Sequence, residues 1–136
     1  MEKLYTAAVT AIGGRDGHIK SSDGVLDLEL RKPKELEGQG GTTNPEQLFA
    51  AAWGACYLGA LGSVAAHDGI DVSDAHVNVQ VSFNKDGNAF ALSADLDVHI
   101  PSLGHDEAQQ LAEKAHRGCP YSKATRGNIE VRVTAV

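Results

Sequence analysis

The sequence predicts an α+β fold in a single domain, residues 1–136, with a mainly antiparallel sheet and one long apolar helix. Alternating apolar and polar residues fill the first third of the chain and flank residues 85–88. Between these regions lies a continuous apolar run, 48–66, and a shorter amphipathic helical pattern covers 105–117. The order strands, helix, strands, helix, strand is typical of the α+β class. A chain of 136 residues has room for one hydrophobic core, without a separate cofactor domain.

Three short strands are expected in the first third of the chain, at residues 4–12, 17–20 and 25–31. Gly-Gly-Arg-Asp-Gly at 13–17 and Ser-Ser-Asp-Gly at 21–24 separate them, and Asp-Gly between alternating runs is a strong hairpin signal. The three strands should form an antiparallel meander with Arg15 at the tip of its first turn. The polar, glycine-rich stretch 33–44 then predicts a loop.

A helix is expected from Asn44 to about His67. Asn44 suits the N-cap, Pro45 the first helical position and Gln47 the third, which completes a capping-box pattern. Residues 48–66 carry no charge and are long enough to span a bilayer. Most of them are alanine and glycine, however, and no Lys or Arg cluster flanks the run. The pattern therefore favours a helix buried inside protein, without a membrane.

Two strands are expected next, at 75–84 and 89–100, followed by a helix at 105–117. Cys119-Pro120 can open a short helix, and a strand at 128–135 closes the chain. The sequence Lys-Asp-Gly-Asn at 85–88 predicts a hairpin between the two strands. Acidic residues early and basic residues late in 105–117 agree with the helix dipole, and Gly118 should end that helix.

Composition excludes several classes of function. A formal net charge of −6, without any run of Lys and Arg, argues against nucleic acid as a partner. The six histidines fit neither HExxH nor zinc-finger spacing, so no metal site is expected. The N-terminal sequence MEKLYTAAVT has no secretory pattern, which predicts a cytoplasmic protein whose thiols are kept reduced. A Cys-His hydrolase stays open, although nothing singles out a histidine for that role.

Cys56 is expected in the middle of the long helix, in an apolar setting that raises the pKa of a thiol. The residues that share its face by three- and four-residue spacing are Phe49, Ala52, Trp53, Gly59 and Ala60. Taken alone, this setting indicates an inert core cysteine. Reactivity requires a cation from elsewhere in the fold.

Arg15 is the candidate cation, because its guanidinium is always charged and offers a planar fork of donors. In a turn it is more often a solvated residue, and a buried arginine would need a carboxylate partner. Glu46 could supply that carboxylate, although the helix dipole alone also favours an acid there. Glu46 and Cys56 are separated by roughly 15 Å along one helix. Either Arg15 bridges much of this distance, or Glu46 comes from a second subunit.

Small residues along the helix would let another helix approach closely: Ala51, Ala52, Gly54, Ala55, Gly59, Ala60 and Gly62. An uncharged helix of this length needs cover on nearly every side, and one chain of this size supplies only one other substantial helix. A homodimer with shared sites is therefore expected.

Cys119 stands directly before Pro120, where a cysteine at a helix N-terminus can have a lowered pKa. It could equally be a small residue between a glycine that ends one helix and a proline. The two cysteines form no CxxC, so exchange chemistry of the thioredoxin kind is not indicated.

Four blocks of sequence resemble the organic hydroperoxide resistance proteins of the OsmC/Ohr superfamily. They are GGRDG at 13–17, SSDGVLDLEL at 21–30, GTTNPEQLFAAAWGACY at 41–57 and CPYSKATRGNIEV at 119–131. Together they cover nearly the whole chain. The CPYSxATRGN form favours the organic hydroperoxide branch over the osmotically induced branch.

The resemblance implies a role for each candidate residue. Cys56 would be the peroxidatic cysteine and Cys119 the resolving cysteine, and an Arg15–Glu46 ion pair would activate the Cys56 thiolate. Phe49 and Trp53 would contribute to an apolar substrate pocket, although packing in the core explains the same residues.

For the molecule as a whole, the resemblance implies an intertwined homodimer, with antiparallel sheets wrapped around a long central buried helix. Its substrates would be bulky organic or fatty-acid hydroperoxides. It would bind no cofactor, and a dithiol on a lipoylated protein would recycle it. Two alternatives stay open: a generic OsmC-type peroxidase of broader range, and a non-catalytic dimeric scaffold with inert cysteines.

Overall fold

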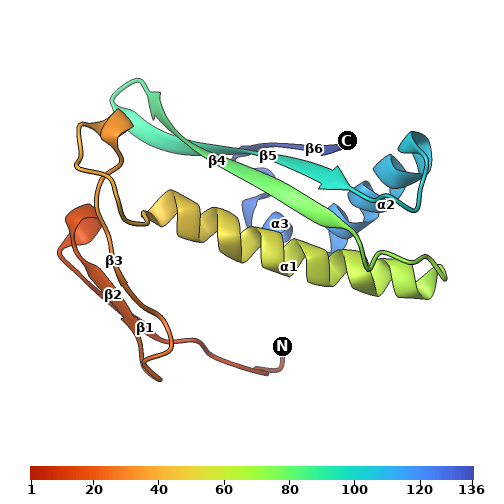
Figure 1. The fold of residues 1–136 in the computed structure, drawn as a ribbon, viewed down its shortest axis with the longest axis horizontal. Helices are drawn as coiled ribbons and strands as arrows, with labels where there is room; N and C mark the ends of the chain where they lie inside the picture. Colours follow the sequence, from red (N-terminus) through yellow and green to blue (C-terminus); the bar gives the residue numbers. More distant parts are fainter. The chain divides into compact units, whose positions relative to one another are not determined.

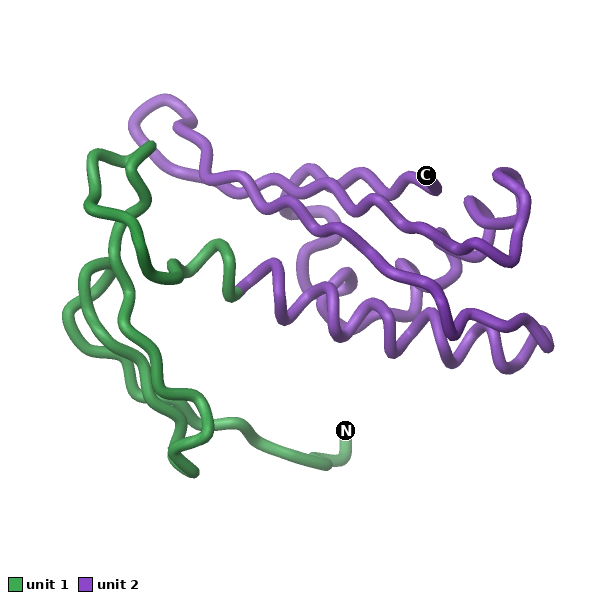
Figure 2. Tube along the Cα trace, viewed as in Figure 1, with its two compact units in different colours: residues 1–48 green, residues 49–136 purple.

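The computed structural model describes all residues, 1–136, as two compact units, residues 1–48 and 49–136 (Figure 2). Helix α1 (Pro45–His67) begins in the first unit and continues into the second. The other elements of the first unit are strands β1 (Val9–Ile12), β2 (His18–Ser21) and β3 (Asp27–Glu29), with short 3-10 helices η1 (Gly14–Asp16) and η2 (Lys34–Leu36). Those of the second unit are β4 (His76–Asp86), β5 (Ala89–His99), α2 (His105–Gly118), α3 (Pro120–Thr125) and β6 (Glu130–Ala135) (Figure 1). The α+β class and the order of elements predicted from the sequence are confirmed.

The first unit is built on an antiparallel sheet in the order β1-β2-β3. Strand β1 starts at Val9, later than the predicted start at residue 4. Pairing with β2 begins only at Val9, and the apolar side chains of Leu4 and Tyr5 are 87% and 82% exposed. The predicted loop, 33–44, contains the short helix η2. Near its end, Thr43 forms an isolated parallel β-bridge with Leu30.

The start of α1 follows the predicted pattern only in part. The Asn44 side chain accepts a hydrogen bond from the backbone N–H of Gln47 at 2.9 Å, as an N-cap residue does. The Gln47 side chain does not return the bond; its amide oxygen accepts from the Thr43 hydroxyl at 3.0 Å. Asn44 therefore caps the helix without a full capping box. The helix ends at His67, as predicted.

The second unit combines a three-stranded sheet with three helices. Strands β4 and β5 form a long antiparallel hairpin, with Gly87 and Asn88 between them. Strand β6 joins β5 in parallel, so α2 and α3 together make the crossover that a parallel pair requires. The sheet is thus mainly antiparallel, as expected, with one parallel edge.

The hydrophobic core of the second unit lies between the sheet, α1 and α2 (Figure 1). Its members from α1 recur every four residues and are fully buried: Trp53, Tyr57, Leu61 and Ala65. Leu96 and Val98 face them from β5, and Leu111 and Ala112 from α2. The Tyr57 hydroxyl donates a hydrogen bond to the backbone carbonyl of Ala112 at 2.7 Å, which fixes α2 against α1.

Helix α1 is long and apolar enough to cross a membrane by length and composition, and 22% of its most apolar window is buried within the chain. Its buried residues belong to the core just described, so α1 is the core helix of this fold. A single chain buries only that one stripe of α1 fully. Residues on its other faces are exposed, among them Ala51, Ala55 and Gly59. The second subunit expected from the sequence would have to supply the missing cover.

The hydrogen bond of Tyr57 provides a test of this core. Tyr57→Phe should lower the free energy of unfolding by about 1 kcal/mol, because a buried hydrogen bond is lost while the ring stays. Urea denaturation at neutral pH measures the difference. The matched control is Tyr5→Phe, the same change on a side chain that is 82% exposed, which should leave stability unaltered. Equal effects of the two substitutions would contradict this view of the α1–α2 contact.

Candidate active site

Two free cysteines meet inside the second unit. The Sγ atoms of Cys56, on α1, and Cys119, directly before α3, lie 3.7 Å apart. Cys119 is fully buried, whereas Cys56 is partly exposed. A disulfide requires about 2.05 Å between the sulfurs, so this is a reduced pair at contact distance. The structure therefore brings together two of the residues singled out in the sequence, although they lie far apart in the chain.

Cys119 is held at a junction of two helices. Its N–H donates to the carbonyl of Ala115 at 2.8 Å, which ends α2, and its carbonyl accepts from the N–H of Lys123 at 2.9 Å, which begins α3. Pro120 occupies the first turn of α3, where its missing N–H costs nothing. As the N-cap residue, Cys119 accepts a hydrogen bond on Sγ from the N–H of Ser122 at 3.5 Å. Backbone bonds on both sides therefore fix the direction of its side chain.

The surroundings of Cys56 disfavour its thiolate. Burial is the largest effect and raises its pKa above the ordinary value for cysteine. A hydrogen bond from the backbone N–H of Tyr121 acts in the opposite direction, while Cys119 raises the pKa further. The apolar setting predicted for Cys56 is thus present, and reactivity still requires a stabilising positive charge.

An arginine–carboxylate ion pair lies in the first unit. The two terminal nitrogens of Arg15 donate to the two carboxylate oxygens of Glu46, at 2.8 and 2.7 Å. This fork geometry is the strong, charge-assisted form of such a pair. The hydrogen bonds from Arg15 hold the pKa of Glu46 below its ordinary value, and the same bonds raise the pKa of Arg15. The partner that the sequence suggested for Arg15 is therefore found beside it.

The Gly-Gly-Arg-Asp-Gly turn is shaped to present Arg15. Gly13 and Gly14 have φ angles of 78° and 65°, in the left-handed region that favours glycine. At Gly17 an added Cβ would lie 1.8 Å from the carbonyl oxygen of Ile12, so no other residue fits without a shift. The short helix η1 between these glycines carries Arg15.

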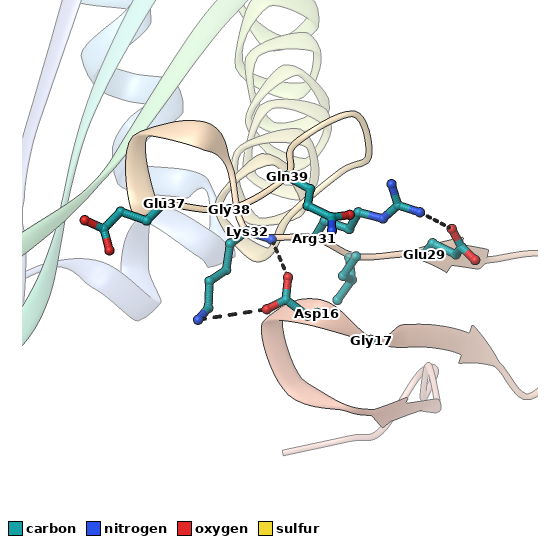
Figure 3. Close-up of a pocket in the computed structure, with 9 residues that line it drawn as sticks. Asp16, Gly17, Glu29, Arg31, Lys32, Glu37, Gly38 and Gln39 are labelled. Carbon is teal, nitrogen blue, oxygen red and sulfur yellow. Dashed lines mark hydrogen bonds and ion pairs between the residues drawn. The ribbon is translucent and has the colours of Figure 1, made fainter.

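A polar cavity of about 390 Å³ lies beside this turn, entirely within the first unit (Figure 3). At its edge, the Asp16 carboxylate accepts from the backbone N–H of Lys32 at 3.0 Å and lies 3.9 Å from the Lys32 ammonium. Arg31 and Glu29 form a second pair, at 3.7 Å. In Figure 3 the side chain of Glu37 points away from both pairs. The two contacts of Asp16 with Lys32 tie the turn that carries Arg15 to the segment that leads into α1.

Phe49 and Trp53, the two residues expected in a substrate pocket, differ in their exposure to solvent. Phe49 is 37% exposed, whereas Trp53 has no accessible surface. Their rings meet edge to face, with centroids 5.9 Å apart. Trp53 lies in the core, and its indole N–H donates to the hydroxyl of Ser122 at 3.0 Å. Core packing therefore accounts for Trp53, and only Phe49 presents surface to a ligand.

Sequence reasoning missed Ser122, which is fully buried and contacts both Cys119 and Trp53. The available signal was its position three residues after an N-cap, where a backbone N–H meets the capping side chain. No pattern in the sequence links Ser122 to Trp53.

Comparison with known proteins decides the family. The family model for OsmC-like proteins matches residues 38–134. An organic hydroperoxide resistance protein of Xanthomonas axonopodis pv. citri is 46% identical over 133 residues, which cover 96% of this chain and 94% of that protein. The chain belongs to the organic hydroperoxide resistance branch of the OsmC/Ohr superfamily. The branch predicted from the two cysteine blocks is thereby confirmed.

Solved structures agree with this assignment. The organic hydroperoxide resistance protein OhrB of Bacillus subtilis has a TM-score of 0.90 and 45% identity, over 98% of this chain and all of that chain. A related protein of Legionella pneumophila reaches a TM-score of 0.92 at 44% identity, covering 98% of each chain. A third, from Vibrio cholerae, has a TM-score of 0.93 at 42% identity, over 99% of this chain and 94% of that chain. Membership supports a role in organic hydroperoxide detoxification.

The ion pair in the first unit predicts a pH-dependent stability. Because the pKa of Glu46 is lowered in the folded state, its contribution is complete above the unfolded pKa, about 4.3, and is lost as the pH falls through the folded value. Glu46→Gln should therefore destabilise the protein by about 1 kcal/mol at pH 7. The difference should shrink steadily below about pH 4.

Urea denaturation of both proteins at pH 7 and at successively lower pH measures this difference. Glu35→Gln, on an exposed carboxylate of the same unit, is the matched control and should show no such trend. A Glu46→Gln effect that stays constant with pH would show that the ion pair is not its source.

Proposed function

We propose that this protein is a two-cysteine thiol peroxidase that reduces organic hydroperoxides to alcohols. The observation that carries the proposal is the reduced pair itself: a partly exposed Cys56 with a buried Cys119 3.7 Å behind it. In a member of the organic hydroperoxide resistance family, this arrangement suits an accessible sulfur that reacts with peroxide and a buried sulfur that then forms a disulfide with it.

The reaction has two steps. The Cys56 thiolate attacks the terminal oxygen of ROOH, so that an S–O bond forms, the O–O bond breaks, and the alkoxide takes up a proton and leaves as alcohol. Cys56 is then a sulfenic acid. The sulfur of Cys119 attacks that of Cys56; an S–S bond forms, and the hydroxyl leaves as water with the proton of the Cys119 thiol.

Arg15 would supply the charge that the Cys56 thiolate needs. Its guanidinium can lower the pKa of a thiol and orient a peroxide oxygen, while Glu46 fixes the direction of the fork. In the proposed homodimer, the arginine and carboxylate come either from the same chain as Cys56 or from the second copy. Phe49 would line the apolar side of the substrate pocket.

Recycling would use a dithiol carried by another protein, with no cofactor bound to this chain. The incoming thiolate must reach one sulfur of the Cys56–Cys119 disulfide, and Cys56 is the accessible one. We propose a lipoylated protein as the reductant and the cytoplasm as the compartment, since thiols there are kept reduced.

One equivalent of organic hydroperoxide should convert the reduced protein to a species about 2 Da lighter, with a Cys56–Cys119 link found by mass spectrometry of peptides. Dihydrolipoamide should restore the original mass. Cys56→Ser should abolish peroxide consumption. Cys119→Ala should still consume one equivalent and then accumulate a Cys56 sulfenic acid that a trapping reagent labels. Two unmodified thiols in the wild-type protein would favour a scaffold without catalysis.

Arg15→Ala should keep the fold and slow the attack on peroxide by a factor on the order of a hundred, since a preorganised charge at the reacting atoms is lost. The matched control is Arg31→Ala, which removes an arginine paired with Glu29 in the same unit and should leave the rate unchanged. Stopped-flow rates with cumene hydroperoxide and with hydrogen peroxide measure both effects. Normal kinetics in Arg15→Ala would refute the activation role, and a preference for hydrogen peroxide would favour the broader OsmC-type peroxidase.

A further inference from the structure

Among the contacts that join α1 to the start of α3, two are spaced alike on both helices. Trp53 and Cys56 are three residues apart on α1, and Cys119 and Ser122 are three residues apart at the start of α3. The indole N–H of Trp53 donates to the Ser122 hydroxyl at 3.0 Å, and Cys56 meets Cys119 at 3.7 Å. The hydrogen bond and the sulfur contact therefore lie one helical turn apart, side by side.

The hydrogen bond is difficult to replace because of where it lies. Trp53 and Ser122 are both fully buried, and the indole N–H can only donate a hydrogen bond, not accept one. If α3 turned or slid along α1, this donor would be left unpaired inside the core, which is unfavourable. The bond thus fixes the register of α3 on α1.

The same serine also acts on the resolving cysteine. The N–H of Ser122 donates to the Sγ of Cys119 at 3.5 Å, while its hydroxyl accepts from Trp53. A continuous chain of contacts therefore runs from the indole of Trp53 through Ser122 to the sulfur of Cys119. Its effect is to hold that sulfur toward Cys56.

We propose that Trp53 and Ser122 are positioning residues for the resolving step, which they accelerate by keeping Cys119 aligned with Cys56. The proposal rests on the two-step peroxidase reaction and deepens it. Neither residue touches peroxide in this scheme, so the attack of Cys56 on ROOH does not depend on them. Condensation does, because the sulfurs must close from 3.7 Å to about 2.05 Å along one direction.

The test separates the two steps in a single turnover. Trp53→Phe removes the donor and keeps an aromatic ring, and Ser122→Ala removes the acceptor. Each should leave the rate of hydroperoxide consumption within about twofold of wild type, and should slow disulfide formation by between about tenfold and a hundredfold. The readout is the lifetime of the Cys56 sulfenic acid, followed with a trapping reagent, and the fraction over-oxidised to sulfinic acid at excess peroxide.

Two further variants keep the proposal falsifiable. In the double variant Trp53→Phe/Ser122→Ala, the rate of Cys56–Cys119 disulfide formation should equal that of the slower single variant. The two effects should not add, because both changes remove the same hydrogen bond. Tyr57→Phe removes another buried hydrogen bond of α1, to Ala112 on α2, and should lose stability without a slower condensation. All variants are compared at a temperature at which each is folded.

Wild-type condensation in Trp53→Phe and Ser122→Ala, or an equal slowing in Tyr57→Phe, would overturn the positioning role. A wild-type protein that consumes hydroperoxide and forms no Cys56–Cys119 disulfide would instead overturn the resolving step itself.

Discussion

A thiol in an apolar surrounding is a poor nucleophile, and Cys56 is in such a surrounding. Burial raises its pKa, and the single opposing group in its own unit is a backbone N–H, from Tyr121. Under the proposed peroxidase mechanism, the Cys56 thiolate would therefore depend on a charge delivered from outside the core. The candidate for that charge is Arg15, which the Gly-Gly-Arg-Asp-Gly turn carries and which Glu46 holds in a bidentate pair.

Each unit holds its own candidate residues in a different way. The first holds an arginine and a carboxylate in a bidentate pair and ties their turn to the following segment through Asp16. The second holds two sulfurs at contact distance, one accessible and one buried, by means of helix ends and buried hydrogen bonds. Ion pairs between partly exposed side chains set the geometry in the first unit, whereas hydrogen bonds inside a packed core set it in the second.

Local patterns in the sequence predicted local structure well. The bounds of α1, the Asn44 cap and the long hairpin follow from capping, charge and turn signals that act within a few residues. The start of β1 was misplaced because alternation alone cannot distinguish a paired strand from an unpaired segment such as 4–8.

Contacts between distant segments were harder to predict from the sequence. The 3.7 Å approach of Cys56 and Cys119 was implied only by resemblance to a family, because no periodicity connects residues so far apart. The bond between Trp53 and Ser122 was not expected at all. The pocket role of Trp53 was implied by the family resemblance, while core packing explained the same residue, and apolar spacing alone could not decide between the two.

The parallel pairing of β5 with β6 has a consequence for how the protein is made. Cys119 lies within the crossover between these strands, and β6 is the last element of the sequence. During synthesis α1, and with it Cys56, leaves the ribosome long before the segment that completes the sheet. Contacts between distant segments form more slowly than local ones, and the two sulfurs belong to residues 63 positions apart in the chain. A nascent chain would therefore carry Cys56 without its neighbouring sulfur until the segment that follows α2 has been made.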